Sequence, residues 1–164
     1  LSGVKFTHLE GGIRVPFLLK YGNQFKASTT FDHPISTFDL LPTFANVAGL
    51  SEEGMEYLDG VNLISFLNGK KQFRPHETLY WKNDAQAAIR DGDWKLIRMP
   101  DRPALLFNIA KDPNEKKDLA QKYPKKVEKL YKKLFAWETT LKRSLWVTRR
   151  EIIQMGIEAF DKYR

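Results

Sequence analysis

Cysteine is absent from this chain of 164 residues. Disulfide bonds, thiolate metal ligands and cysteine nucleophiles are therefore excluded within it. Long apolar runs are absent as well: no stretch approaches the roughly eighteen consecutive apolar residues that a membrane-spanning helix needs, so the sequence predicts no membrane span. There is also no Asn-x-Ser/Thr sequon, which favours a bacterial source over a glycosylated animal source.

The bulk composition nevertheless predicts a folded chain. Hydrophobic residues make up 42% and aromatic residues 13% of the sequence, which is enough for a core and argues against disorder. The length suits one domain or a large part of a bigger one. Because the chain opens on Leu1 and has no charged-then-apolar leader, we expect that the beginning of the gene product is missing.

Positive charge is concentrated in the last third. The formal net charge is +7, and residues 111–150 contain thirteen lysine or arginine residues against five acidic residues. Such a region is typical of a surface that attracts nucleic acid, membrane or acidic polysaccharide. An ordinary solvated helix face explains the same charge, and we favour that interpretation.

A strand followed by a helix is predicted in the first third. Residues 13–21 contain an apolar run expected of a buried strand. The following helix has Ser36 as N-cap and Asp39 three residues later, which predicts a capping box. Pro42 predicts a kink or restart, and Gly49 is suited to the end of the helix.

A small antiparallel sheet is predicted next. Strands are expected over residues 77–81, 87–90, 93–98 and 105–109. Asp91-Gly92 is a strong signal for a two-residue hairpin turn. That turn would pair Ile89 with Trp94, and Leu96 would lie further along the same face.

The end of the chain is predicted to be helical. Pro124 suits the first turn of a helix, after which apolar residues repeat at helical spacing and lysines fall mostly on the other side. A further helix is expected over residues 150–160. We expect Trp94 and Trp137 to pack in the core or between sheet and helix.

Lys5 stands five residues ahead of a Glu-Gly-Gly-Ile-Arg-Val-Pro run at residues 10–16. This arrangement resembles the segment of sulfatases that carries their sulfate-binding lysine. The other segments that are similar to sulfatases, in the right order, are residues 34–49, 58–70, 88–97 and 107–120. Together they resemble the C-terminal part of a formylglycine-dependent sulfatase of the alkaline-phosphatase superfamily, over roughly residues 1–140.

The resemblance implies a fold class and a division of the chain. The expected fold is α+β, a fragment of an α/β sulfatase fold. It has one strand and helix of the large sheet, then a small antiparallel sheet packed on a C-terminal helix. Residues 1–70 would end the catalytic domain, residues 71–141 would form the small subdomain, and residues 142–164 a helical extension.

The resemblance also implies a sulfuric ester hydrolase that uses calcium and a formylglycine made within a Cys/Ser-x-Pro-x-Arg motif. This chain contains no such motif, and the family's last Asp-Asn metal pair would fall upstream of Leu1. We therefore expect no metal site in the chain, and no activity without an N-terminal sulfatase segment as partner. The expected substrate is a sulfated small molecule or glycan, and the expected location is periplasmic or secreted.

The candidate site residues are Lys5 and His8. The resemblance makes Lys5 the catalytic, sulfate-binding cation, which would stabilise negative charge on sulfate oxygens. His8 lies in the same loop and is a candidate for substrate contact or proton transfer, because an unperturbed imidazole titrates near about pH 6.5. Glu10 and Arg14 are expected to brace the loop.

The remaining histidines give no metal signal. His33 and His76 lie beside prolines in loops, and neither has a second histidine or a carboxylate at ligand spacing. His76 and Trp81 are possible sugar contacts, an interpretation that we do not favour.

Two alternatives to a sulfatase remain open. A phosphoesterase or phosphonate-ester hydrolase of the same superfamily would use the same cation for a phosphoryl group. A non-catalytic basic module that binds anionic glycan through its lysine-rich helix would instead show affinity that falls steeply with salt. We expect no nucleic-acid partner.

Overall fold

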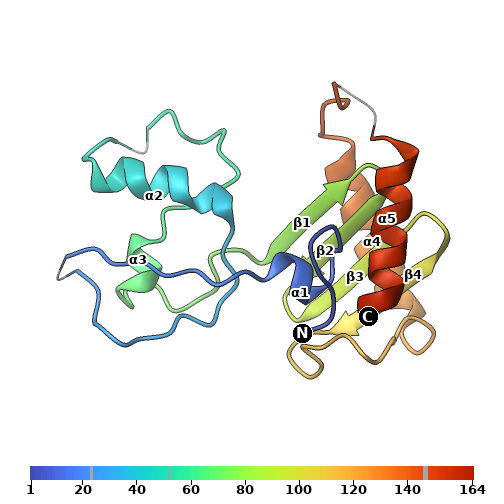
Figure 1. Ribbon diagram of the computed structural model, residues 1–164. Coiled ribbons are helices and arrows are strands. Elements are labelled where there is room, and N and C mark those ends of the chain that lie inside the picture. Colours follow the sequence, from blue (N-terminus) through green and yellow to red (C-terminus); the bar gives the residue numbers. More distant parts are fainter. Residues whose placement is uncertain (23, 52, 146–147) are drawn as a thin grey trace. The chain divides into compact units, whose positions relative to one another are not determined.

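The computed structural model describes residues 1–22, 24–51, 53–145 and 148–164. They form two compact units, which are treated separately below (Figure 1). The sheet unit comprises Leu1–Pro16 and Thr78–Arg164, and the helical unit comprises Phe17–Glu77. Helices and an antiparallel sheet are both present, as predicted for an α+β chain. The functional division at residues 70 and 141 stays a prediction.

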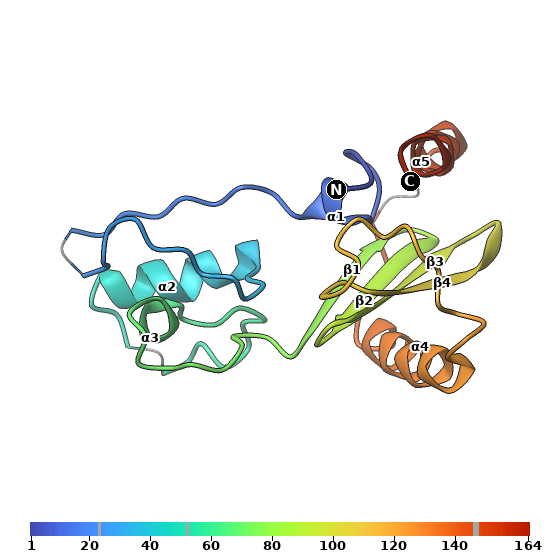
Figure 2. The ribbon, with the colours of Figure 1, turned by 90° about the horizontal axis from the view of Figure 1, so that it is seen from below.

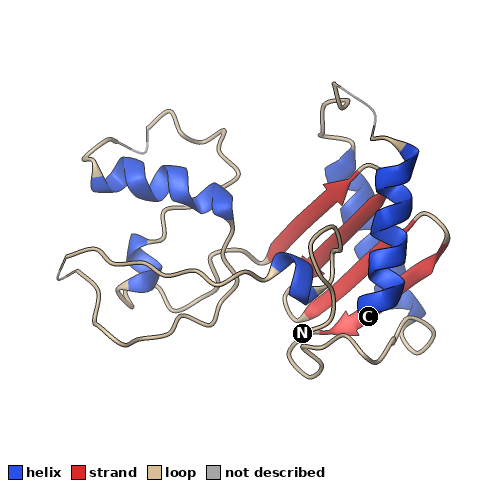
Figure 3. Ribbon diagram, in the orientation of Figure 1, coloured by secondary structure: helices blue, strands red, loops and turns tan. Residues whose placement is uncertain are grey.

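The sheet unit is built on four antiparallel strands in the order of the sequence (Figure 3). The strands are β1 (Thr78–Asn83), β2 (Gln86–Asp91), β3 (Trp94–Met99) and β4 (Arg102–Asn108). Each strand pairs with the next one along the chain. The prediction of a small antiparallel sheet is therefore confirmed.

The hairpin between β2 and β3 differs from the prediction in its register. Asp91 pairs with Trp94 and Ile89 pairs with Leu96, so the turn consists of Gly92 and Asp93. Gly92 has a φ of 59°, the left-handed conformation that a tight hairpin turn favours at its first central position. The register shift amounts to two residues, so every side chain stays on its predicted face.

A helix covers each face of this sheet (Figure 2). On one face, α4 (Pro124–Glu138) buries Leu130 and Leu134 against Ile89, Leu96 and their neighbours. Trp94 and Trp137 pack against this cluster, as predicted. On the other face, α5 (Arg150–Tyr163) buries Phe160 in a second cluster.

The helical unit contains a 3₁₀ turn, η1 (Thr37–Asp39), followed by α2 (Leu40–Val47) and α3 (Ile64–Leu67). The predicted capping box is confirmed, because the Ser36 side chain accepts the Phe38 N–H and Asp39 accepts the Ser36 N–H. The expected restart takes the form of the 3₁₀ turn before α2. No helix in the described part of the chain has both the length and the hydropathy to cross a bilayer.

The predicted strand over residues 13–21 is wrong. Residues 10–13 form a one-turn helix, α1 (Glu10–Ile13), and residues 14–21 have no regular secondary structure. Phe17 and Leu18 are exposed, the latter at 95%. A continuous apolar run is typical of a strand inside a parallel sheet, and among the described residues it has no strand to pair with.

Candidate functional site

Lys5 lies at the centre of a tight turn that spans residues 4–7. The Thr7 N–H donates to the Val4 carbonyl oxygen at 3.0 Å. The Thr7 hydroxyl donates to the same oxygen at 2.7 Å and accepts the Val4 N–H at 3.2 Å. Lys5 and Phe6 are the two central residues, and both are exposed. We call residues 4–7 the Lys5 turn.

The backbone of the Lys5 turn is strained at Phe6, which has a φ of 77°. A positive φ is uncommon for a bulky side chain and persists only where the surroundings hold it. The Lys5 ammonium lies 5.3 Å from the centroid of the Phe6 ring. Within the described ranges, no carboxylate forms an ion pair with Lys5. The turn therefore presents its ammonium group at the surface, away from the described carboxylates.

Two glycines of α1 allow the N-terminal loop to lie directly on the helix. The Gly11 N–H donates to the Ser2 carbonyl oxygen at 2.6 Å. A Cβ atom on Gly12 would lie 2.3 Å from the Thr7 carbonyl oxygen and 2.6 Å from that of Val4. These contacts are shorter than any real Cβ contact, so the Gly-Gly pair is required by the close approach of the backbone. The Lys5 turn is thereby seated on α1.

Glu10, the first residue of α1, is anchored in the interior. The Lys95 ammonium, fully buried on β3, donates to Glu10 Oε1 at 2.8 Å and lies 2.8 Å from Glu115 Oε1. Only the first of these contacts has hydrogen-bond geometry, because Glu115 Oε1 accepts no hydrogen bond from the described residues. The Glu10 N–H donates to Glu115 Oε2 at 2.6 Å. The structure thus shows Glu10 bracing the loop, whereas Arg14 is exposed.

The charges in this cluster are closely balanced. Two carboxylates face the Lys95 ammonium, and Arg90 Nη1 lies 3.8 Å from Glu10 Oε2. Burial raises the pKa of the Glu115 carboxyl above its ordinary value, although the adjacent Lys95 opposes this rise. A buried cation between two carboxylates avoids the large cost of an unpaired buried charge.

His8 lies in the same region and is buried, with 9% of its surface exposed. Its Nδ1 has no hydrogen-bond partner among the described residues. Burial first, and the Lys95 charge second, lower the pKa of His8 to about 4. His8 is therefore neutral at neutral pH, and the ordinary imidazole pKa assumed from the sequence is wrong for this residue.

His76 has a partner that the sequence did not reveal. Its Nε2 lies 2.7 Å from Oδ1 of Asp39, which is fully buried. Asp39 also accepts the N–H groups of Ser36 and Val61 at 2.7 and 2.8 Å. The two residues are 37 positions apart, so no local motif signals the contact. His76 thus helps to hold the helical unit together.

His33 and Trp81 also make internal contacts. The His33 ring packs edge-on against Phe31, with a distance of 5.4 Å between centroids. Trp81 packs against the core cluster on the α5 side of the sheet. These contacts favour structural roles over sugar binding.

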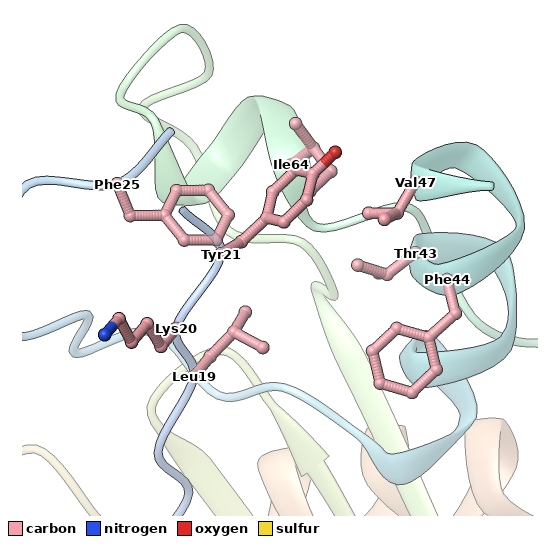
Figure 4. A pocket seen from close by; sticks show the side chains of 8 residues that line it. All are labelled: Leu19, Lys20, Tyr21, Phe25, Thr43, Phe44, Val47 and Ile64. Carbon is pink, nitrogen blue, oxygen red and sulfur yellow. The ribbon is translucent and has the colours of Figure 1, made fainter. Parts of the chain in front are cut away.

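A small apolar pocket lies within the helical unit (Figure 4). Figure 4 shows Phe44, Val47 and Ile64 turned toward Leu19 and Tyr21. The pocket lining contains no carboxylate and no histidine. Among the described residues, Lys20, Tyr21 and Thr43 are its polar lining, and the rest of the lining is apolar. Because no carboxylate or imidazole stands beside these groups to activate them, we do not choose this pocket as the candidate active site.

The residues of this chain do not suit a calcium site or a formylglycine. Across the residues that the structure describes, no three His, Cys, Asp or Glu side chains are grouped so that they could hold a metal ion. The sequence has no cysteine and no Ser-x-Pro-x-Arg motif. The described residues of this region offer the exposed Lys5 ammonium and, beneath its turn, the buried cluster of Glu10, Lys95 and Glu115.

Comparisons with known proteins converge on one family. Residues 5–143 match the family described as "N-sulphoglucosamine sulphohydrolase, C-terminal". The chain is 34% identical over 121 residues to a choline-sulfatase of Rhizobium meliloti, a match that covers 71% of this chain and 23% of that protein. It is 30% identical over 151 residues to a steryl-sulfatase of Homo sapiens, covering 72% of this chain and 26% of that protein.

The fold comparison agrees. The crystal structure of Ps i-CgsB superposes with a TM-score of 0.62 at 28% identity, covering 80% of this chain and 31% of that one. The same protein in complex with k-i-k-neocarrahexaose gives a TM-score of 0.61 at 29% identity, with the same coverage. The chain thus spans about a quarter to a third of the length of these relatives.

Proposed function

Because this chain belongs to the N-sulphoglucosamine sulphohydrolase C-terminal family of sulfatases, we propose that it forms the C-terminal part of an enzyme that hydrolyses sulfate esters. Its contribution to the site is Lys5, which binds the sulfate group. The observation that supports this proposal best is the exposure of Lys5 on a turn that lies on α1, whose first residue, Glu10, belongs to the buried cluster with Lys95 and Glu115.

Lys5 supplies electrostatic stabilisation. Negative charge grows on the sulfate oxygens and on the leaving oxygen as the ester bond breaks, and a fixed cation favours that state over the ground state. An ammonium offers three donors as a compact point charge. The stabilisation that this ammonium provides depends on where it lies. The strained Phe6 backbone and the glycines beneath the turn restrict its position.

His8 is the second substrate-binding residue of the proposal. Its Nδ1 supports this role, because it has no hydrogen-bond partner among the described residues and buried polar atoms nearly always have one. With a pKa of about 4, His8 is neutral at neutral pH, so it would act as a hydrogen-bonding group. We do not assign it the proton transfer considered from the sequence.

The nucleophile and the calcium ligands would come from an N-terminal sulfatase segment, and this chain alone would be inactive. The exposed apolar residues at positions 15–19 support that arrangement, since such residues favour burial against further protein. We propose a bacterial enzyme, periplasmic or secreted, that acts on a sulfated small molecule or glycan.

The first test is the coding sequence upstream of Leu1. It should encode an Asp-Asn pair shortly before Leu1 and a Cys/Ser-x-Pro-x-Arg motif further upstream. An unrelated domain there would contradict the proposal and would favour a non-catalytic anion-binding module.

The second test is the variant Lys5→Ala in the enzyme encoded by that longer sequence. With an aryl sulfate as probe, kcat should fall by about a hundredfold or more. Lys125→Ala is the matched control, because Lys125 is an exposed lysine on α4, and it should leave kcat unchanged. Equal activities of the two variants would contradict the proposed role of Lys5 in the site.

A further inference from the structure

We propose that α5 is a positioning element for the Lys5 turn. The glycines of α1 support the turn from one direction, and α5 holds the residues immediately before and after it. The catalytic consequence of this inference rests on the proposed function, whereas the structural coupling can be tested without any activity. The family match ends at residue 143, so α5 lies beyond the part of the chain that carries the family likeness.

A backbone hydrogen bond joins α5 to the start of the loop. The Gly3 N–H donates to the carbonyl oxygen of Tyr163 at 2.8 Å. Tyr163 is the last residue of α5, where carbonyl groups have no partner within the helix. Gly3 directly precedes Val4, the first residue of the Lys5 turn. The end of α5 therefore fixes the backbone on the N-terminal side of Lys5.

A buried apolar cluster that α5 shares with Leu9 holds the other side of the turn. Phe160 of α5 and Leu9 are both fully buried members of one core cluster. Leu9 lies between the Lys5 turn and α1. Since packed side chains transmit displacement, a shift of α5 would move Leu9 and with it the C-terminal end of the turn.

Independent contacts hold α5 itself in place. Arg102 of β4 pairs with Asp161 through both of its terminal nitrogens. A Cβ atom on Gly156 would lie 2.7 Å from the side-chain nitrogen of Gln86, so α5 passes close to the start of β2. The helix is thus attached to the rigid sheet as well as to the loop.

The loop after β4 connects the same two segments. The Lys116 ammonium donates to the carbonyl oxygen of Arg164 at 2.7 Å, and the Ser2 hydroxyl donates to that of Asn114 at 2.6 Å. Residues 114–116 therefore touch both the end of α5 and the residue before Gly3. These contacts hold the chain ahead of Phe6 in place, which is the condition under which its strained φ can persist.

The first experiment isolates the hydrogen bond in the 164-residue chain. Deleting residues 163–164 removes the acceptor of the Gly3 N–H, whereas deleting Arg164 alone keeps it. Amide hydrogen exchange at Gly3 should become roughly fivefold faster in the longer deletion, as expected for one lost hydrogen bond. The β2 and β3 amides should keep their protection in both. Equal Gly3 exchange in the two deletions would overturn the proposal.

The second experiment tests the apolar contact. Phe160→Ala should accelerate exchange at Thr7 and Gly12 under conditions in which the sheet amides stay protected. Met155→Ala is the matched control, because Met155 is an exposed residue of the same helix, and it should leave these amides unchanged. Phe160→Leu should restore most of the protection. Acceleration that spreads equally over the sheet would mean that Phe160 has only a general structural role.

The third experiment measures catalysis in the complete enzyme. Phe160→Ala should lower kcat by about tenfold or more with a smaller change in KM, because a misplaced cation chiefly loses transition-state stabilisation. An unchanged kcat together with faster exchange would contradict the catalytic part of the inference. If Lys5→Ala itself leaves activity unchanged, the proposed function fails, and the exchange experiments still decide whether α5 holds the turn.

Discussion

The ammonium of Lys95 donates to the carboxylate of Glu10 at 2.8 Å, although the two residues are 85 positions apart in the sequence. Lys95 is fully buried and Glu10 is 2% exposed. The pair joins the second residue of β3 to the first residue of α1. Since α1 carries the glycines on which the Lys5 turn lies, this ion pair connects the candidate site to the sheet.

Lys95→Met should therefore strongly destabilise the sheet unit. The substitution keeps most of the side-chain volume and removes the ammonium that lies between the buried carboxylates of Glu10 and Glu115. Breaking one partner out of a buried charge cluster typically costs about 3–5 kcal/mol. Urea denaturation followed by tryptophan fluorescence would measure this loss, because Trp94 is the neighbouring residue.

Lys132→Met provides the comparison for that experiment. Lys132 pairs with Glu128 on the exposed side of α4, where both side chains are mostly solvent-accessible. Solvent and salt screen such an exposed pair, so its loss should change the stability very little. If the two variants lose similar stability, the buried cluster does not stabilise the sheet unit more than the exposed pair does.

Gly12→Ala should displace the Lys5 turn. The new methyl group would meet the carbonyl oxygens of Thr7 and Val4 at 2.3 and 2.6 Å, and overpacking of this kind costs about 1–3 kcal/mol. Faster amide exchange at Thr7 should accompany the loss. Gly54→Ala serves as control, since Gly54 has a φ of 81° and open space around it. It should lose stability without any change at Thr7.

Local signals in the sequence predicted much of the fold. The capping box at Ser36 and Asp39 and the glycine turn at Gly92 depend on residues only a few positions apart, so their geometry is contained in short stretches of chain. The amphipathic pattern of α4 likewise follows from its own residues. The predicted register of the hairpin differs from the observed one because Asp91-Gly92 and Gly92-Asp93 are both plausible turns. The pairing of the two whole strands decides which of these turns forms.

Contacts between distant segments could not be predicted in the same way. Nothing near Lys95 indicates that it pairs with Glu10, and nothing near Tyr163 indicates that it accepts a hydrogen bond from Gly3. The wrong strand at residues 13–21 has the same origin, because an apolar run reports a tendency to be buried and not the presence of a pairing partner. The likeness to sulfatases made Lys5 a candidate, and the contacts that support its turn became visible only in three dimensions.

Asp39→Ala should destabilise the helical unit by about 3 kcal/mol, because it removes a buried acceptor of several hydrogen bonds and leaves their donors unsatisfied. The donors are the N–H groups of Ser36 and Val61 and the imidazole of His76. Amide exchange at Val61 would report the loss directly. Asp32→Ala should have almost no effect, since Asp32 is exposed. A comparable change in both variants would contradict the role of Asp39.

Stability of the sheet unit should fall in acid because of His8. Its folded-state pKa is about 4, whereas an unfolded histidine titrates near about 6.5. Between these values the unfolded chain binds more protons than the folded chain, so the free energy of unfolding rises with pH across that window and levels off above it. The full difference amounts to at most about 3 kcal/mol. Urea titrations from pH 4 to pH 7 would measure how steeply the free energy of unfolding rises with pH. His8→Phe should make this rise less steep, and the part that remains would come from the carboxylates. A slope that is identical in the two proteins would show that His8 is not held neutral by burial.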